Sequence, residues 1–516
     1  YMNKKWECYN IDDNKVEELV EQKHISNLLA SILVNRGITE EKELEVFLNP
    51  TRKDFYDPFL LPDMEIAVDR IIKAVNNKEK IMIYGDYDAD GITSVSVLKK
   101  YLNQIGLETG EYIPNRLNEG YGLNKEAILK IYNMGYKLMV TVDCGISGLE
   151  EVEYANTLGI ETIITDHHEP AEQLPNAIAV IDAKRKDNIY PFNQLAGVGV
   201  VFKLIQAISI KLNLDEKEYL KYLDLVCIGT ISDIVPLVDE NRVIAKLGLK
   251  LIEQTKNIGL RTLLNIANFK KIDSNAISFG VAPRINACGR MGAQEEALKL
   301  FLTEDKQEAL KIAKNLVKFN QERQNTEKQI FEDVIQEIEK NNDKEKKCIV
   351  LAKENWHHGI IGIVSSKVTE MYYKPSILIC LEGDMGKGSG RSVPGFDLYN
   401  ALSKCNNYIE KFGGHSMAIG ISIKKENFEK LKAEIEKCAE ESNISIDKRI
   451  NLKDISIEEA KSLELLEPFG EANKMPIFLI QNLKIDSIRA LSDGKHLKLT
   501  LKQDNYIIDA IGFNMG

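Results

Sequence analysis

Four short apolar runs alternate with helix-like stretches in the first half of the chain. The runs are IMIYG (81–85), KLMVTVD (137–143), ETIITD (161–166) and AIAVID (177–182). Parallel strands need a long connection, usually a helix, so this alternation is typical of a parallel sheet covered by helices. The pattern predicts an α/β fold, with a first α/β domain over residues 51–292.

The length of the chain requires further domains, because a single core stops growing at about 250–300 residues and the chain has 516. Residues 293–345 contain no proline and many strong helix formers, which predicts a long connecting helix or a helix pair. Strand-like runs at 347–353 and 376–382 then indicate a second α/β domain over residues 346–445.

The two ends of the chain differ from these domains. Residues 1–50 predict an N-terminal helical appendage that ends at Asn49-Pro50, since proline disfavours helix in the residue before it. In residues 446–516, strand runs are separated by Asp493-Gly494, a β-hairpin signal. We interpret this segment as the start of a small β-module and expect the natural chain to continue past Gly516.

The composition excludes some classes of protein. No apolar run approaches the roughly 18–20 residues that a membrane span needs, so an integral membrane protein is excluded. Eight cysteines lie far apart without a C-x-x-C pair, which favours a reduced, cytoplasmic protein. The net charge of −11 by itself disfavours a nucleic-acid partner. However, net charge sums over the whole surface, and a binding groove needs only a local positive potential.

Acidic and histidine residues follow three of the predicted strands. They are Asp86, Asp88 and Asp90 after the first, Asp143 at the end of the second, and Asp166, His167 and His168 at the end of the third. Ligands bind at the carboxyl ends of strands in open parallel sheets, so these side chains should converge on one edge. Carboxylates this close repel one another unless cations neutralise them. The cluster therefore predicts a site for metal ions.

Carboxylate and imidazole ligands without thiolates suit manganese, with magnesium as the second choice. Two ions about 3.5–4 Å apart would serve in-line displacement at phosphorus. Asp233 in GTISDIVPL is a further candidate ligand, because a bare carboxylate between apolar runs is costly to bury. A helix N-cap remains an open alternative for Asp90 taken alone, and we expect Asp182 to cap a helix or form a salt bridge.

Glycine-rich and basic segments are candidates for binding phosphate. GKGSGRS (386–392) offers backbone N–H groups, with Lys387, Arg391 and Ser392 as side-chain donors. The pair Gly413-Gly414 before His415 suggests a tight backbone turn. Further candidates are Arg116, Arg284 and Arg290, although each arginine could form a surface ion pair and His415 could be structural. The G-V-G at residues 197–199 is only a fragment of a dinucleotide fingerprint, and we expect no nucleotide there.

Several motifs together resemble a known family. DYDADG, VDCG, TDHH and SDIVP are similar, in order and spacing, to the four metal-binding motifs of the DHH phosphoesterases. GGHSMAIG is similar to the signature of their DHH-associated domain. EGYGLN, APRINACGRMG and GSGRSVPGFDL narrow the resemblance to the RecJ branch of single-strand-specific exonucleases. LEPFGEANKMPIF resembles the start of the oligonucleotide-binding (OB) barrel of that branch.

This resemblance implies a DHH catalytic domain, a DHH-associated substrate-binding domain joined to it by a long helix, and an OB-like module for single strands. It implies a 5′-to-3′ exonuclease that degrades single-stranded DNA to nucleoside 5′-monophosphates in recombination and repair, with two metal ions. A single-stranded-DNA-binding protein and a helicase would be further partners, and we expect a monomer. Two alternatives are a phosphoesterase for short oligonucleotides or cyclic dinucleotides, and an inactive DNA-binding scaffold. The intact motif acids and histidines disfavour the scaffold.

By motif position, the resemblance also implies residue roles. Metal ligands and catalytic residues would be Asp88, Asp90, Asp143, His167 and Asp233, with Asp86 and His168 in or next to the same shell. Phosphates would be held by Arg116, Arg284, Arg290, Lys387, Arg391, Ser392, Gly414 and His415. Many family members have a histidine where this chain has Tyr84, and Asp86 is the candidate substitute ligand.

Overall fold

The computed structural model describes residues 5–116, 119–120, 122–393, 396–438, 443–513 and 515. Three residues of the family-like motifs, Tyr121, Pro394 and Gly395, lie outside these ranges. The chain divides into two compact units. The first comprises residues 49–333 and 468–474, and the second comprises 1–48, 334–467 and 475–516. Within the described ranges, no helix has both the length and the apolar character needed to cross a membrane.

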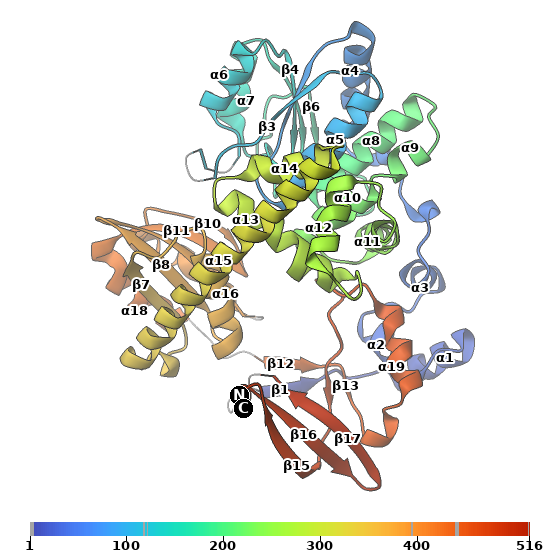
Figure 1. The fold of residues 1–516 in the computed structure, drawn as a ribbon, viewed down its shortest axis with the longest axis vertical. Helices are drawn as coiled ribbons and strands as arrows, with labels where there is room; N and C mark the ends of the chain where they lie inside the picture. The colour runs from blue at the N-terminus through green and yellow to red at the C-terminus, as the bar shows by residue number, and fades with distance from the viewer. Residues whose placement is uncertain are drawn as a thin grey trace. The chain divides into compact units, whose positions relative to one another are not determined.

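A five-stranded parallel sheet forms the centre of the first unit (Figure 1). Its order is β3 (Thr109–Tyr112), β2 (Ile81–Tyr84), β4 (Leu138–Val142), β5 (Glu161–Thr165) and β6 (Ala179–Ile181). The four predicted runs correspond to β2, β4, β5 and β6. The chain leaves β2 toward β3 on one side and later returns to β4 on the other. Such a switch point leaves a crevice at the carboxyl ends of the strands.

Helices cover both faces of this sheet. On one face, Ile81 and Ile83 belong to the same core as helices α4 (Met64–Asn77), α5 (Ala89–Gln104) and α8 (Gly197–Lys211). On the other, Met82 and Tyr84 pack with α6 (Lys125–Asn133) and α7 (Leu149–Thr157). This alternation follows from the two-residue period of a strand, and it means that a β2 residue belongs to one layer only.

Further helices complete the first unit beside α5 and α8. They are α9 (Lys217–Leu220), α10 (Leu223–Ser232), α11 (Asp239–Ile252), α12 (Ile258–Ala267), a π-helical segment (Ala276–Val281), α13 (Ala282–Arg290) and α14 (Gln294–Leu302). Helix α15 (Lys306–Asn341) follows and is 36 residues long. The helix pair predicted for 293–345 is therefore α14 and α15.

The second unit contains a mixed five-stranded sheet. Its order is β10 (Lys411–His415), β11 (Ala418–Lys424), β9 (Met385–Arg391), β8 (Ser376–Glu382) and β7 (Ile349–Glu354). Only β7 and β8 are parallel. Its helices are α16 (Ile361–Tyr372), α17 (Leu398–Ser403) and α18 (Phe428–Cys438).

The glycines of GKGSGRS have a packing role in this sheet. Strand β9 pairs with a neighbour on both sides, so its backbone N–H groups serve the sheet. The prediction that these N–H groups approach a phosphate is therefore wrong. A Cβ atom on Gly388 would lie only 2.8 Å from the side chains of Ile379 and Ile421. The glycines face the core, and Lys387, Ser389 and Arg391 lie on the opposite face of the strand.

Two smaller sheets and a β-meander complete the second unit. Helices α1 (Asp13–Lys23), α2 (Asn27–Asn35) and α3 (Glu41–Leu48) follow β1 (Lys5–Cys8), which pairs in parallel with β12 (Asn443–Ile446). The sequence pattern predicts only helices here and misses β1, because its pairing partner lies at the far end of the chain. Near the C-terminus are β13 (Lys448–Arg449), β14 (Phe478–Leu479), α19 (Ile457–Leu463) and the antiparallel strands β15 (Lys484–Leu491), β16 (His496–Gln503) and β17 (Tyr506–Gly512). The predicted hairpin at Asp493-Gly494 joins β15 to β16 and is confirmed.

Candidate metal centre

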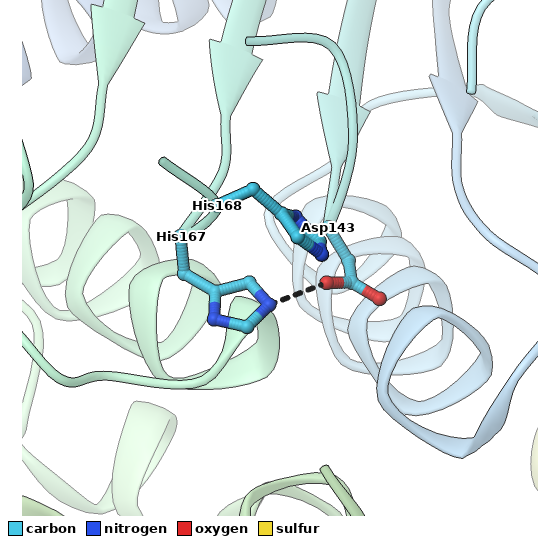
Figure 2. Close-up of side chains that lie close together, drawn as sticks. All are labelled: Asp143, His167 and His168. Carbon is cyan, nitrogen blue, oxygen red and sulfur yellow. Dashed lines mark ion pairs between the residues drawn. The ribbon is translucent and has the colours of Figure 1, made fainter. Parts of the chain in front are cut away.

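Ligand-type side chains gather at the carboxyl edge of the parallel sheet, as the strand ends predict. His167 and His168 follow β5, and Asp143 follows β4; Figure 2 shows His167 directed at Asp143 from the adjacent strand. The Nε2 atom of His167 lies 3.1 Å from Oδ1 of Asp143, 3.6 Å from Oδ2 of Asp233 and 4.0 Å from Oδ2 of Asp90. Thus one imidazole nitrogen faces three carboxylates.

Three overlapping groups of donor atoms could each hold a metal ion. They are Asp143, His167 and His168; Asp90, His167 and Asp233; and Asp86, Asp88 and Asp143. Within each group the donor atoms lie within 4.8 Å of one another. Asp143 belongs to two groups, so it could bridge neighbouring ions. All seven predicted metal ligands belong to at least one group.

Unsatisfied buried atoms support a cation at this site. Oδ1 of Asp143, Oδ1 of Asp86 and Nε2 of His167 are buried and form no hydrogen bond within the described part of the chain. Leaving such atoms without partners is costly, whereas divalent cations bound by the donor groups would satisfy them. The mixed oxygen and nitrogen donor set therefore fits manganese or magnesium.

The electrostatics of the cluster lead to the same conclusion. Burial, and then the charge of Asp88, raises the pKa of Asp90 to about 7. Burial and neighbouring carboxylates raise the pKa values of Asp86, Asp143 and Asp233 well above their usual range. Without cations these groups would take up protons, and bound cations would keep them ionised.

His167 is prepared as a neutral ligand. Burial lowers its pKa to about 3, so the ring is uncharged near neutral pH. Its Nε2 atom is buried and has no hydrogen-bond partner in the described structure, so this nitrogen is available to bind a metal ion.

Asp166 orients His168. Its Oδ1 atom lies 2.7 Å from Nδ1 of His168 and accepts the backbone N–H of His167, while Oδ2 accepts the N–H of Ile146. Burial alone would raise the pKa of Asp166, but the hydrogen bond and charge of His168 outweigh it and lower that pKa. Asp166 thus belongs to the site as the residue that holds His168 in place.

The roles of Asp88 and Asp90 differ from the simplest expectation. Asp88 is the N-cap of α5, and its Oδ1 accepts the N–H groups of Asp90 and Gly91. The N-cap alternative for Asp90 is therefore wrong. Asp90 instead accepts the N–H groups of Gly197, at 2.7 Å, and Val198, at 2.8 Å, at the start of α8. The positive end of α8 thereby stabilises the Asp90 carboxylate.

Gly197 is a functional residue that sequence reasoning missed. A Cβ atom there would lie 2.5 Å from Oδ1 of Asp143. Only glycine lets α8 begin this close to the ligand. The sequence shows a glycine at position 197, but the reason for it is a contact with Asp143, which lies more than fifty positions away in the sequence.

Replacing Gly197 with alanine should weaken manganese binding by about 10–100-fold, the range seen when residues supporting a metal ligand are changed. The new methyl group would displace the Asp143 carboxylate. Isothermal titration with Mn²⁺ measures the affinity. Gly199→Ala is the matched control on the same helix, because its Cβ would meet only the Leu195 side chain, at 3.3 Å. Equal affinities for the two variants would contradict this role of Gly197.

Tyr84 lies outside the cluster, in the layer of the core that packs on α6 and α7. Its hydroxyl donates to the carbonyl of Gly122 at 2.9 Å and lies 3.2 Å from the Asn124 amide, and its ring stacks on Tyr112. The side chain that replaces the family histidine is thus a core residue. Asp86 does join a group of donors, with Asp88 and Asp143, and its role as substitute ligand stays a prediction.

The three predicted arginines of the first unit separate into two locations. The Arg116 guanidinium lies 5.0 Å above the ring of Tyr87, and the charge of Arg290 also acts on Tyr87, which stands between the candidate ligands Asp86 and Asp88. Residues 85–90, between the end of β2 and the first turn of α5, form what we call the metal loop. Helix α13 contacts this loop through Asn286, whose Oδ1 accepts the N–H of Ala89. Arg284, by contrast, lines a separate hollow.

The remaining candidates lie on the mixed sheet of the second unit. His415 is opposite Ala418, which is opposite Arg391, so these three residues share a position across adjacent strands. A Cβ on Gly414 would clash with the Ala418 carbonyl, and its φ of +131° also requires glycine. The glycine pair lies in β10 itself rather than in the turn that follows it. Ser392 donates to the Phe396 carbonyl, at 2.7 Å.

Comparisons with known proteins agree with this architecture. The DHH family N-terminal domain matches residues 80–230, the DHHA1 domain matches 345–441, and the RecJ OB domain matches 446–516. The chain is 39% identical to the single-stranded-DNA-specific exonuclease RecJ of Bacillus subtilis over 99% of its own length, and it spans 66% of that relative. It is 32% identical to the Haemophilus influenzae RecJ, over 95% of this chain and 89% of the relative.

Solved structures give the same result. The fold is similar to the crystal structure of Thermus thermophilus RecJ in complex with Mn²⁺, with a TM-score of 0.86 and 28% sequence identity. The likeness covers 99% of this chain and 74% of that one. The Mg²⁺ complex of the same protein matches with a TM-score of 0.80.

Proposed function

Because the chain belongs to the RecJ family of DHH phosphoesterases, we propose that it is a metal-dependent exonuclease that degrades single-stranded DNA. The proposal includes 5′-to-3′ direction, release of nucleoside 5′-monophosphates and a role in recombination and repair. The observation that carries it is the cluster around Nε2 of His167, where three carboxylates lie within 4.0 Å.

We assign two divalent cations to the cluster, with manganese favoured over magnesium. One would be held by Asp90, His167 and Asp233, and the other by Asp86, Asp88 and Asp143, with Asp143 shared and His168 beside them. Such cations neutralise charge on the phosphoryl oxygens and lower the pKa of water. The protein contributes the orientation of the ligands: α8 holds Asp90, and Asp166 holds His168.

Substrate phosphates require cations from the protein as well. We propose that Arg116 and Arg290, beside the metal loop, bind the phosphate under attack. On the second unit, we propose that Lys387, Arg391, Ser392, Gly414 and His415 bind further phosphates. The domain assignment follows: 51–292 catalytic, 293–345 connecting, 346–445 substrate-binding and 446–516 OB-like. A single-stranded-DNA-binding protein and a helicase are the proposed partners.

Digestion of strands labelled at either end tests the function. Strands with and without a 5′-phosphate are incubated with Mn²⁺ or Mg²⁺, and a blunt duplex is the control. We expect mononucleotides from the 5′ end first and little attack on the duplex. Cleavage of dinucleotides alone would favour a phosphoesterase for short substrates, and strand binding without any cleavage would favour a scaffold.

A further inference from the structure

The first unit has a hollow of about 500 Å³ that none of the metal-ligand groups lines. The loop after α12, the π-helical segment, α13 and α15 surround it. Its lining includes Phe269, Lys270, Lys271, Phe279, Arg284 and Asn320. Aromatic, cationic and amide side chains therefore meet in one concave site.

Phe279 is the most unusual residue of this hollow, because its side chain is 80% exposed. It belongs to the π-helical segment 276–281, and such segments are rare and often mark functional sites. The next residue, Gly280, has no side chain, and a Cβ there would clash with the ring of Phe269. Phe269 therefore packs against the segment while Phe279 projects into solvent. An exposed ring at the rim of a polar hollow is suited to stack on a base.

The charge of the lining is opposite to that of the chain. Lys270, Lys271 and Arg284 contribute three positive charges, against one acid, Asp273. The Asp273 carboxylate is already used, since it accepts the N–H of Ala276 at 2.9 Å. In a chain with a net charge of −11, this hollow is thus a local positive site. Cations near an aromatic ring fit the phosphates that flank a stacked base.

The polar groups of the hollow can recognise a base edge. The guanidinium of Arg284 donates from NH1 to the Gly280 carbonyl, while its Nε is buried without a hydrogen-bond partner in the described structure. The lining also contains the amides of Asn275 and Gln324, together with Asn320, whose Oδ1 accepts from Arg323, and Gln321, whose Nε2 donates to Asn325. Amide side chains both donate and accept hydrogen bonds, as the edges of bases require.

The hollow is also close to the metal centre along the chain. Helix α13 continues directly from the π-helical segment, and its Asn286 holds the N–H of Ala89 in the metal loop. The stretch from Phe279 to Asn286 rises roughly 10 Å if helical throughout. A strand of a few nucleotides can therefore extend from the metal centre to the hollow.

We propose that this hollow binds an unpaired base of the substrate strand, with Phe279 as the stacking surface and Lys270, Lys271 and Arg284 facing the adjacent phosphates. The inference rests on the proposed action on single-stranded DNA and extends it. It adds a base-binding subsite, formed by none of the metal-ligand groups, that would hold the strand during successive cleavages.

Fluorescence of a Phe279→Trp variant tests the subsite directly. The variant of the whole 516-residue chain is titrated with an oligothymidylate in the presence of a chelator, which removes metal ions so that the strand is not degraded. The strand has about 20 nucleotides, a length that exceeds a typical single-strand site. Stacking should quench the introduced indole, and an abasic strand of equal length should not. Met134→Trp is the matched control, because Met134 is 62% exposed and precedes the amino end of β4, on the opposite edge of the sheet.

Loss of the ring should weaken strand binding. Phe279→Ala should raise the Kd for the oligonucleotide about 5- to 150-fold, the effect of one stacked base, without lowering the thermal stability. A wild-type protein that degrades strands, together with a Phe279→Trp variant that shows no quenching, would overturn the subsite alone. A wild-type protein that neither binds nor degrades strands would overturn the proposed function and the subsite with it. Quenching by the abasic strand would contradict base binding.

Discussion

Replacing Asp143 with alanine should reduce manganese-dependent strand degradation by at least about 10³-fold while strand binding remains measurable. Asp143 belongs to two of the three donor groups, and its Oδ1 lies 3.1 Å from Nε2 of His167. Its Oδ1 is also buried without a hydrogen-bond partner in the described structure, so alanine would remove a donor atom that only the cluster can use. Single-turnover rates and metal titration measure the two effects.

Asp182→Asn is the matched control for this prediction. Asp182 is also a buried carboxylate at the end of a strand, β6, but it belongs to none of the donor groups found in the described residues. Burial raises its pKa to about 7, so it is largely protonated below that pH and an amide resembles it. Its Oδ1 accepts the N–H of Lys184, a bond that asparagine keeps. Comparable losses in the two variants would refute the metal assignment of Asp143.

The edge of the sheet that carries the site could be predicted because it depends on short stretches of sequence, namely the apolar runs and the polar residues that directly follow them. Apolar runs specify strands, and the carboxyl ends of parallel strands meet at one edge whatever the details of packing. Asp143 comes directly after β4, and Asp166, His167 and His168 come directly after β5. Asp233 follows helix α10 and not a strand, so its candidacy comes from its apolar neighbours in the sequence and from the resemblance, not from the strand ends.

The contacts that complete the site could not be predicted from the sequence. Gly197 supports Asp90 and crowds Asp143 only because α8 begins beside the ends of β2 and β4. The glycines of β9 resemble a phosphate loop until the pairing on both sides of the strand is known. In both cases a glycine is needed because a segment distant in sequence packs closely against it, and the sequence alone does not identify that segment. The polar edge strand β3 was missed because TGEY lacks an apolar run.

In the absence of metal ions, the first unit should lose stability as the pH rises above about 6.5. The pKa of Asp90 is raised to about 7 by burial and by Asp88, and burial and neighbouring carboxylates also raise the pKa values of Asp86, Asp143 and Asp233 well above their usual range. A carboxyl group whose pKa is higher in the folded protein stabilises the fold while it is protonated. That contribution disappears as the pH rises through the folded pKa.

The contribution of His167 to stability changes with pH in the opposite direction, and this determines the pH range over which the loss should be measured. Because burial lowers its pKa to about 3, its contribution increases with pH only up to the unfolded value of about 6.5 and is constant above it. The carboxyl groups therefore determine the slope at higher pH. Ionisation of Asp90 alone should lower the free energy of unfolding by about 1 kcal/mol between about pH 6.5 and about pH 8. Ionisation of the other three aspartates should lower it further.

Manganese should reverse this dependence, because the ions replace the protons and bind more tightly as the protons leave. Thermal unfolding in chelator and in excess Mn²⁺, across about pH 6.5 to 8, measures both slopes. Asp233→Asn removes one titrating carboxyl, so its slope in chelator should be shallower than that of the wild type and its gain from manganese smaller. If the metal-free protein instead becomes more stable over this pH range, the carboxylates of the cluster do not repel one another in the way proposed, and cations would have no repulsion to relieve.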